Sequence, residues 1–541
     1  MQLHQTHNLC RFEQLVTRYA PFIPALIGAL VFLPTLRYGF VWDDLLSVKQ
    51  NLALRSWSTL SHVFWGMIDY RMYRPLTSGI PVFQFHLFGL HPWGYHLTSI
   101  VLHALVCYLV FQIALRLSGS RRVALFAGTL FALHAAHVEA VAWISAFAEP
   151  LAAVFILLGF LLYLGYRDQR NGKSLLLLCL TLFLGLLTKE TAIVLPLLIL
   201  IYELTMGDSA LRKWRHHVPA VACLACTVGI YFALRHAVCK VFISAAAPHT
   251  TTETAIWTVP DLLMTYVRHL VVPVPLSPFY DASYVASPGR GFWIPIAIVV
   301  VLTIALWAVA KRLEMRLLLF CGIAILVPLL PVLNLNFFLP GETIHDRFLY
   351  LPSVFFSLLA GLLVFRLAGD SKPQRFHLAH VLGLALLAVN AFSLAVYCPV
   401  WSNDLVFYGY SARMAPKNHR PLFGLARTHL ERGDYRRSEA ALEQVLRLRS
   451  DPEAFIKLGQ LRMRMGRPED AEYPLRQALA LVPDRPGLHL DLGQALEVLG
   501  RTDEARLEYE REIAVSPNNK DLAYEFIDRL PATRQRSSSS R

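Results

Sequence analysis

Two adjacent carboxylates, Asp43 and Asp44, come directly after the first apolar stretch of the chain. One carboxylate at such a place can serve as a general base for a hydroxyl group, and a pair can bind a divalent metal ion. A solvated loop acid or a helix N-cap is the simpler interpretation. Because charged groups next to lipid are costly without a task, this pair is the first candidate for a catalytic site.

Three basic residues, Arg74, Lys189 and Arg347, lie beside apolar stretches. A cation at such a place can bind an anion or extend toward lipid headgroups. Lys189 precedes Glu190, but adjacent residues do not face each other on a helix, so the lysine can meet another group such as a phosphate. The densest polar group consists of Glu342, His345, Asp346 and Arg347, and we expect it to have a function.

His134 and His137 lie about one helical turn apart, and Glu139 follows two residues later. This pattern could bind zinc, but its spacing differs from the H-E-x-x-H motif of metalloproteases. A pair of interface histidines bonded to the backbone is the simpler alternative. Glu149 falls inside the next apolar stretch, where an ionisable residue is a functional candidate by default.

The elements that position these residues are predicted to be membrane helices. The chain of 541 residues is 55% hydrophobic and only 16% charged, whereas a soluble domain carries about 25% charged residues. About 20 apolar residues cross a bilayer as a helix. The sequence therefore predicts an all-α, polytopic bundle of about eleven transmembrane helices, namely 20–37, 96–117, 123–138, 143–165, 174–188, 190–205, 218–235, 291–310, 316–335, 347–366 and 378–398.

The charge of the loops predicts the orientation of this bundle. Loops that hold Arg121, Arg167 and Lys173 alternate with longer loops that are poorer in basic residues, and basic loops face the cytoplasm. The N-terminus, with Arg11 and Arg18, is then inside, and the polar groups above gather on the outer side. Basic loops also explain a pI near 9.4. Because no compact basic face with exposed aromatic residues is visible, nucleic acid is not an expected partner.

From residue 403 the pattern changes to soluble helices with a period of 33 to 34 residues. Leu458-Gly459 recurs as Leu492-Gly493, and Gly433, Gly466 and Gly500 repeat at the same spacing. This period is typical of tetratricopeptide repeats, each a helix-turn-helix unit. We expect a repeat domain over 403–533, with three clear repeats at about 418–517, and a disordered tail over 534–541. A generic array of helical hairpins is the alternative.

Together these segments resemble the transmembrane and tetratricopeptide-repeat (TMTC) protein O-mannosyltransferases and their prokaryotic relatives. The matching segments are, in chain order, 40–44, 73–77, 87–103, 133–149, 188–190 and 346–352. The resemblance implies a GT-C membrane glycosyltransferase domain over residues 1–402. It also implies transfer of a sugar from a polyprenyl-phosphate carrier to Ser or Thr hydroxyls of proteins on the outer or lumenal side.

The residues fit such a reaction. A polyprenyl-phosphate sugar keeps its tail in the bilayer and its phosphate at the interface, where Arg or Lys can stabilise the leaving phosphate. Arg347 is the first candidate for this role, followed by Lys189, Arg74 and His345. The acceptor hydroxyl needs a base; Asp43, at the family-like position, is the first choice and Asp44 the second. The residues expected to orient donor or acceptor are His137, Glu139, Glu149, Glu190 and Asp346.

A single displacement of this kind inverts the anomeric carbon and needs no obligatory cofactor, although Asp43 and Asp44 could hold a divalent metal ion. The expected partners are the lipid-linked donor, membrane lipids and an acceptor protein bound by the repeats. Two alternatives stay open: a transferase that glycosylates lipid or polysaccharide, and a non-catalytic scaffold anchored in the membrane. A bacterial inner membrane is the favoured location, with the endoplasmic reticulum as the alternative.

Overall fold

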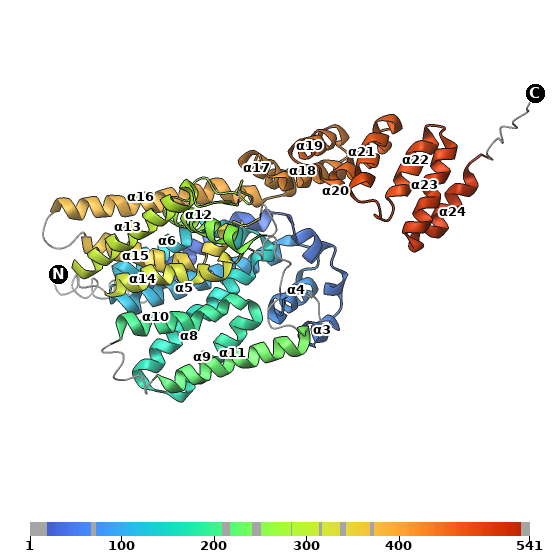
Figure 1. Ribbon diagram of the computed structural model, residues 1–541. Coiled ribbons are helices and arrows are strands. Elements are labelled where there is room, and N and C mark those ends of the chain that lie inside the picture. Colours follow the sequence, from blue (N-terminus) through green and yellow to red (C-terminus); the bar gives the residue numbers. More distant parts are fainter. Residues whose placement is uncertain are drawn as a thin grey trace, which may run out of the picture. The chain divides into compact units, whose positions relative to one another are not determined.

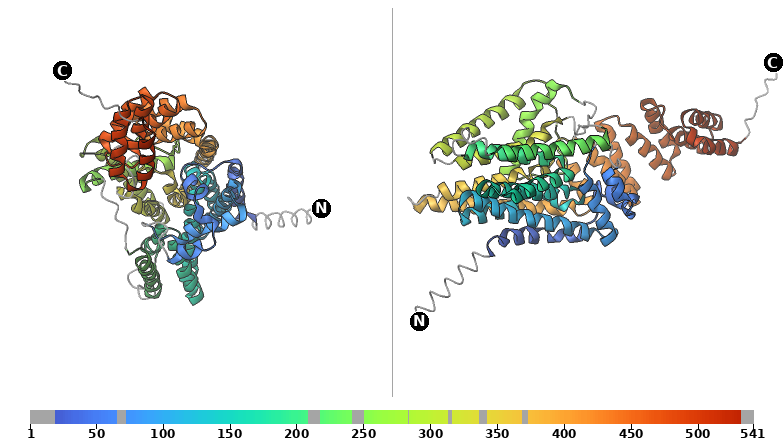
Figure 2. Two further views of the ribbon diagram at one scale, coloured as in Figure 1. Left: turned by 90° about the vertical axis from the view of Figure 1, so that its right-hand side faces the viewer. Right: turned by 90° about the horizontal axis from the view of Figure 1, so that it is seen from below.

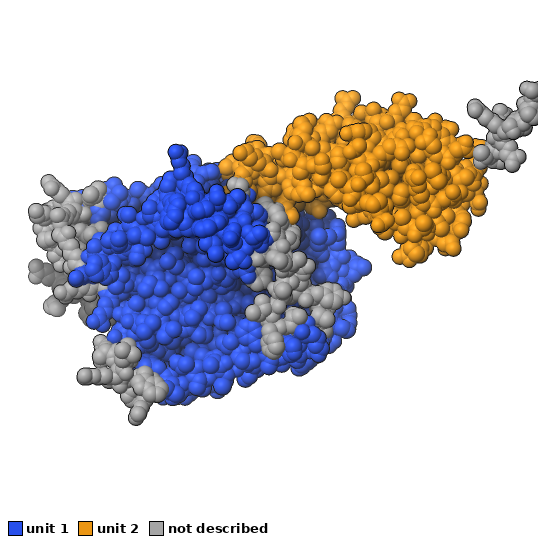
Figure 3. Space-filling view, in the orientation of Figure 1, with its two compact units in different colours: residues 1–278, 282–407 blue, residues 279–281, 408–541 orange. Residues whose placement is uncertain are grey.

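The computed structural model describes residues 19–65, 72–207, 217–240, 250–282, 284–312, 316–335, 342–367 and 373–531. Across these ranges every regular element is a helix. The chain divides into two compact units, residues 1–278 with 282–407 and residues 279–281 with 408–541 (Figure 3). The division at 407–408 lies close to the predicted boundary at 402–403. Arg11, Arg18 and the predicted disordered tail lie outside the described residues.

The first unit is a bundle of apolar helices. Six helices of the described residues are long and apolar enough to cross a membrane, or seven if a pair bent by 49° counts as one span. The six are Pro92–Ser118 (α5), Ile144–Gln169, Val218–Cys239 (α11), Arg290–Lys311, Arg316–Leu333 and Ala379–Trp401. The bent pair joins Arg121–Leu133 (α6) to Ala135–Ala142. Shorter apolar helices cover Phe22–Arg37, Gly172–Thr188 (α9) and Pro352–Phe365.

Each of the eleven predicted spans overlaps a helix, which confirms an all-helical membrane bundle, but fewer helices pass as simple spans. The reason is that several apolar segments are interrupted. The segment predicted as 190–205 is divided into a 3-10 turn, Glu190–Ile193, and the short helix α10, Val194–Met206. The segment predicted as 123–138 ends at Leu133 and bends. These interruptions create the candidate site described below.

Helix α8 (Ala148–Gln169) packs against α5, α9 and α10, and Figures 1 and 2 show these helices running side by side. Helix α6 packs between α2 (Phe22–Phe32), α5 and α15 (Pro352–Leu367). In the sequence, two short helices, α3 (Thr59–Trp65) and α4 (Pro75–Phe88), follow the apolar helix α2 and precede α5. Helix α4 also packs against α9, which brings Arg74 at its start close to the end of α9.

Three further apolar helices complete the bundle. Helix α13 (Arg290–Arg312) packs against α12 (Thr252–Val271) and α14 (Arg316–Leu326), and α14 packs against α10 and α15. Helix α16 (Pro373–Tyr397) packs against α6 and α15 and leads through a 3-10 turn, Cys398–Trp401, to α17 (Asp404–Met414). The division between the two units falls within α17.

The second unit is an array of helical hairpins. Its helices are α18 (His419–Glu431), α19 (Tyr435–Leu448), α20 (Pro452–Arg464), α21 (Pro468–Leu481), α22 (Leu488–Val498), α23 (Thr502–Val515) and α24 (Lys520–Arg529). Gly433, Gly466 and Gly500 turn each hairpin with φ between +71° and +76°, a conformation that glycine adopts without cost. A Cβ atom on Gly459 would lie 2.5 Å from Leu475 of the partner helix. The repeat period thus reflects close helix approach.

Candidate active site

Three helix breaks in the membrane unit have the same local design. At each break one residue is extended and a 3-10 turn follows: Trp143 before Ile144–Ala146, Lys189 before Glu190–Ile193, and His345 before Asp346–Leu349. A break frees backbone groups and turns side chains toward one another, which uninterrupted helices would keep apart. In membrane proteins such irregular backbone is tolerated where it is buried in protein or lines a cavity. The breaks collect the candidate residues in one place.

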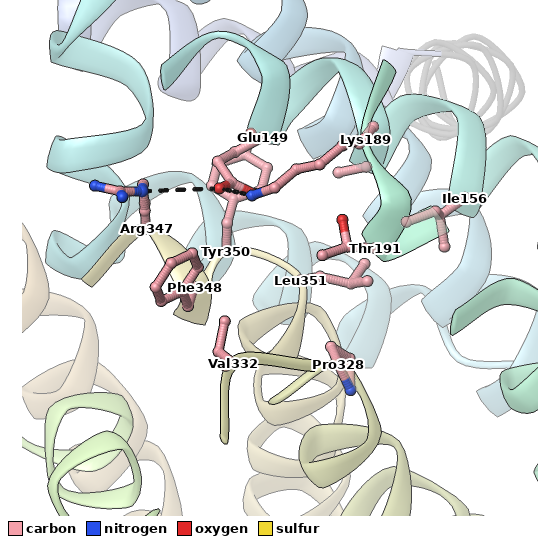
Figure 4. A pocket seen from close by; sticks show the side chains of 12 residues that line it. Glu149, Ile156, Lys189, Thr191, Pro328, Val332, Arg347, Phe348, Tyr350 and Leu351 are labelled. Carbon is pink, nitrogen blue, oxygen red and sulfur yellow. Dashed lines mark hydrogen bonds and ion pairs between the residues drawn. The ribbon is translucent and has the colours of Figure 1, made fainter. Parts of the chain in front are cut away.

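A cavity of about 30 Å³ lies between these breaks (Figure 4). Glu149, Lys189 and Arg347 supply its charged lining. Lys189 Nζ pairs with Glu149 Oε1, and Arg347 Nε lies 4.0 Å from the same oxygen (Figure 4). The side chains of Lys189 and Glu149 are only 9% and 12% exposed. One carboxylate therefore holds two cations together at a nearly dry site.

Glu139 fixes Arg347 from the other side. This carboxylate is fully buried and pairs with the guanidinium of Arg347. Its second oxygen accepts a hydrogen bond of 3.2 Å from the backbone N–H of Arg347, and His345 Nδ1 lies 3.2 Å from the first oxygen. Because a buried carboxylate without partners is very costly, Glu139 needs these contacts. The result is an arginine whose position is set by both its main chain and its side chain.

A second ionic group lies next to the first, because its carboxylate, Glu190, directly follows Lys189 in the chain. Glu190 accepts hydrogen bonds from Arg74 Nε at 2.6 Å and from Arg235 Nη1 at 2.8 Å. Arg235 stands in α11 with a side chain that is 6% exposed. Together the two groups contain four cations and three carboxylates. The cations are Lys189, Arg347, Arg74 and Arg235, and the carboxylates are Glu139, Glu149 and Glu190. This excess of positive charge, held in a low-dielectric place, favours an anionic ligand.

Aromatic rings contact both cations of the cavity. The guanidinium of Arg347 lies 5.0 Å from the ring centres of both Trp143 and Phe348. Lys189 Nζ lies 5.3 Å from the ring centre of Phe348. Cation–π contacts of this kind keep the two cations in place without neutralising them. Tyr350, which also lines the cavity, has its hydroxyl 2.8 Å from His103 Nδ1.

The two carboxylates of the first loop occupy different environments. Asp44 is fully buried; its Oδ1 accepts hydrogen bonds from the backbone N–H of Ser145 at 2.9 Å and from the hydroxyl of Ser145 at 2.5 Å. Its Oδ2 accepts from Val41 N at 3.2 Å. Burial raises the pKa of Asp44 to about 7, although the hydrogen bonds from Ser145 and Val41 act against that rise. Asp43 is exposed. Asp44 joins this loop to the Trp143 break, and Asp43 is the accessible carboxylate.

The structure brings seven of the predicted residues together in two ionic networks. Lys189, Glu149, Arg347, Glu139 and His345 form one network, and Arg74 with Glu190 forms the adjoining one. The other four are Asp43 and Asp44 of the first loop, and His137 and Asp346, which have other partners. His137 is fully buried and bonded through Nε2 to Ser353 Oγ at 2.6 Å. Asp346 is fully buried against His269, with 2.9 Å between Oδ1 and Nδ1.

Two participants were missed in the sequence, Arg235 and His269. Arg235 is the last residue of the predicted span 218–235, and an ionisable residue at the end of a membrane span is a signal of a functional site. His269 lies in α12, an amphipathic helix whose buried face no motif identified. Within the described ranges no group of three or more His, Cys, Asp or Glu residues is arranged to hold a metal ion.

The protein is an integral membrane protein of the all-helical class. Its membrane bundle holds a buried cationic site and is followed by tetratricopeptide repeats. Comparisons with known proteins agree. Residues 75–233 match the family model of dolichyl-phosphate-mannose-protein mannosyltransferases, and residues 423–486 and 456–520 match a tetratricopeptide-repeat model. The first match runs from the start of α4 into α11 and includes Glu139, Glu149, Lys189 and Glu190. Arg74 directly precedes the matched range, and Arg235 and Arg347 follow it.

The chain is also similar to curated TMTC proteins, which confirms the resemblance found in the sequence. It is 35% identical over 176 residues to the protein O-mannosyl-transferase Tmtc1 of Drosophila melanogaster, covering 31% of this chain and 20% of that protein. It is 25% identical over 420 residues to protein O-mannosyl-transferase F38B6.6 of Caenorhabditis elegans, covering 74% and 58%. In these two alignments the chain thus spans 20% and 58% of the length of the relatives it matches.

Among solved structures, the chain is similar to ArnT from Cupriavidus metallidurans bound to undecaprenyl phosphate. The TM-score is 0.41 at 18% identity, and the match covers 90% of this chain and 79% of that one. At this identity and TM-score the similarity is too remote to assign a function.

Proposed function

We propose that this protein is an integral membrane glycosyltransferase. It moves a single, mannose-like sugar from a polyprenyl-phosphate carrier to Ser or Thr hydroxyls of exported proteins. The observation that carries the proposal is the pair of cations, Lys189 and Arg347, held around one carboxylate in a nearly dry cavity. Buried cations at the mouth of membrane helices are expensive and mark a ligand site. The names of the curated relatives and of the matched family support a mannosyl donor.

The donor phosphate fits the charges of this cavity. When the sugar–phosphate bond breaks, negative charge grows on the phosphate, and preorganised cations stabilise that charge most strongly in a dry site. Arg347 is the proposed principal ligand because Glu139 fixes its orientation. Lys189 is the second, and Arg74 and His345 support them from the adjoining contacts. No metal ion is needed for a lipid monophosphate in this scheme.

The cavity is smaller than the proposed donor head. A volume of about 30 Å³ holds a water-sized group, whereas small-molecule pockets span roughly 300–1,000 Å³. The Lys189–Glu149 ion pair therefore occupies part of the space that the donor head needs, and we propose that it opens when the donor binds. A phosphate that takes over Lys189 leaves Glu149 to orient the sugar hydroxyls, and Glu190, held by Arg74 and Arg235, stays in place.

Asp43 is the proposed general base. It is the exposed member of the acidic pair, whereas Asp44 is fully buried. Removal of the hydroxyl proton as the nucleophile attacks is worth a large rate factor. Attack opposite to the leaving phosphate inverts the anomeric carbon. The repeats are proposed to bind the acceptor protein, since stacked helical hairpins form an extended concave surface. The loop charges favour a cytoplasmic N-terminus and repeats on the outer side of the membrane. The proposed location is a bacterial inner membrane.

The test is sugar transfer by the purified protein in nanodiscs, with a panel of polyprenyl-phosphate monosaccharides and a pool of exported proteins. Intact-mass detection should show a sugar-sized gain on Ser or Thr with at least one donor. Arg347→Ala should lose that gain, and Asn171→Ala, which removes a helix cap remote from the site, should keep it. Gain on lipid alone would replace the protein acceptor by a lipid one. No gain with any donor, from folded protein, would reject the transferase.

A further inference from the structure

Trp42, the residue before the acidic pair, holds a backbone conformation that bulky residues rarely adopt. Its φ is +55°, in the left-handed region that favours glycine. A residue stays in such a conformation only where its surroundings hold it, and such residues gather at functional sites. Because Asp43 follows directly, the contacts that hold Trp42 also decide where the proposed base is placed.

Several of those contacts come from the last residues of the membrane unit in the sequence. The backbone N–H of Trp42 donates a 2.9 Å hydrogen bond to Oδ1 of Asp404, which lies 362 residues away in the chain. The indole is stacked on Trp143, with ring centres 4.6 Å apart at 24°, and on Phe407, with ring centres 5.8 Å apart at 30°. Asp404 and Phe407 belong to the first turn of α17, immediately before the chain enters the repeat unit at Tyr408.

The stack continues from Trp42 to the cationic side of the cavity. Trp143 carries the guanidinium of Arg347 5.0 Å from its ring centre. The break that follows Trp143 also holds Ser145, whose backbone and hydroxyl bind Asp44. One aromatic stack thus joins the loop of the acidic pair to the proposed phosphate ligand. A displacement of Trp42 would move both the base and the cation relative to the donor.

We infer that Asp404 and Phe407 are positioning residues for sugar transfer, which act by holding Trp42 between them and Trp143. This inference rests on the proposed function, since it takes Asp43 as the base and Arg347 as the phosphate ligand. Neither positioning residue is among those that line the cavity. Their loss therefore lowers the rate of the transfer step, while donor binding through Lys189 is kept. The chain segment that leads to the repeats thus also fixes the loop that carries Asp43.

Two substitutions at one position test this role. Asp404→Ala removes the acceptor of the Trp42 N–H, whereas Asp404→Asn keeps an acceptor oxygen of the same shape. We expect Asp404→Ala to lower kcat about 10- to 100-fold, as small misplacements of reacting groups do, with little change in KM for the donor. Asp404→Asn should restore most of kcat, and Asn171→Ala should match wild type. A kcat of Asp404→Ala equal to wild type, or an equal loss in both Asp404 variants, would overturn the inference.

Hydrogen exchange gives a second readout that needs no activity. In wild type the amide of Trp42 is hydrogen bonded to Asp404, so this amide should be protected in a peptide that begins several residues before Trp42. Asp404→Ala should speed its exchange, and Asp404→Asn should not. Unchanged protection in Asp404→Ala would overturn the inference by itself. If wild type transfers no sugar, the proposed function fails, and this exchange measurement alone decides whether Asp404 holds the loop.

Discussion

The two units of this protein use ionic groups in opposite ways. In the membrane unit Glu139 is fully buried, Lys189 is 9% exposed, and their partners come from distant segments of the chain. In the repeat unit a typical pair is Arg501 with Glu504, which are 39% and 50% exposed and lie on one helix turn. Exposed pairs contribute little to stability, whereas buried ones carry a large desolvation cost.

The difference indicates where function is concentrated. The repeat unit is stabilised by apolar packing and small residues, as in the buried cluster that joins Leu475, Leu492 and Tyr509. Its charges keep the surface soluble. The membrane unit places four cations and three carboxylates among apolar helices, where charged groups carry a large desolvation cost. A stable arrangement that keeps such costly groups is preorganised for a ligand, here proposed to be a phosphate. Single substitutions can test this contrast.

Asp43→Asn should have the largest effect on activity. Removing a general base lowers the rate by about 10²- to 10⁴-fold, and the exposed position of Asp43 means that folding should not suffer. Single-turnover transfer and thermal unfolding, measured on the same preparation, separate the two effects. Asp44→Asn is the matched control, since it changes the buried acid that joins two loops. A smaller loss of rate in Asp43→Asn than in Asp44→Asn would reverse their roles.

Arg347→Ala should come next, with loss of both rate and stability. One preorganised charge donor is worth on the order of 10²- to 10³-fold in rate. The substitution also leaves Glu139 buried without its cation, which costs about 3–5 kcal/mol. Arg476→Ala is the counterpart in the repeat unit, where its partners Glu472 and Glu504 are 21% and 50% exposed. Thermal unfolding should show a large drop for Arg347→Ala and almost none for Arg476→Ala. Equal drops would remove the contrast between the units.

Gly459→Ala should destabilise the repeat unit and spare the cavity. The new Cβ atom would lie 2.5 Å from Leu475 Cγ, and overpacking of this kind costs about 1–3 kcal/mol. Gly409→Ala is the control, because no atom lies within 4 Å of its added Cβ. Limited proteolysis of the repeat unit at increasing temperature should separate the two variants. Repeats that tolerate both changes equally would show that close helix approach is not what holds them.

The smallest effect concerns pH. Burial raises the pKa of Asp44 from 3.8 to about 7. Between these values the unfolded chain loses the proton while the folded protein keeps it, so folded stability falls as pH rises from about 4 to about 7 and is level above. Asp44→Asn lacks this dependence. Thermal unfolding at several pH values should show wild type losing stability relative to Asp44→Asn over that window. A relative gain with rising pH would mean an ionised Asp44 with a low pKa.

The position and the repeat architecture of the repeat unit could be predicted from the sequence. Its signal is local and periodic: Gly433, Gly466 and Gly500 mark the turns, and Gly459 and Gly493 mark the close contacts. Each hairpin is defined within about 34 residues. The membrane helices could be located in the same way, because length and hydropathy are local properties. Their interruptions could be predicted only in part. Lys189 and Glu190 mark the boundary between two predicted spans, but the sequence does not show that Glu190–Ile193 forms a 3-10 turn before α10 begins at Val194.

The site could be predicted as a list of residues but not as a network. Lys189 was expected to meet a group other than Glu190, and its partner is Glu149, 40 residues earlier. The pairing of Arg347 with Glu139 spans 208 residues. Such contacts depend on how α8 packs against α9, and on how the turn Asp346–Leu349 packs against the short helix Val138–Ala142. No single segment encodes this packing. Trp42 also shows this limit: Asp404 has no motif that links it to the first loop.

The central claim is that the Lys189–Arg347 cavity binds the phosphate of a polyprenyl carrier. Native mass spectrometry of the protein in nanodiscs, titrated with a polyprenyl phosphate, measures this binding directly without any transfer. Wild type should bind the lipid phosphate in preference to the matching polyprenol. Arg347→Ala and Lys189→Ala should lose that preference, and Asn171→Ala should retain it. Equal binding of phosphate and alcohol in wild type, or undiminished preference in both cavity variants, would contradict the account.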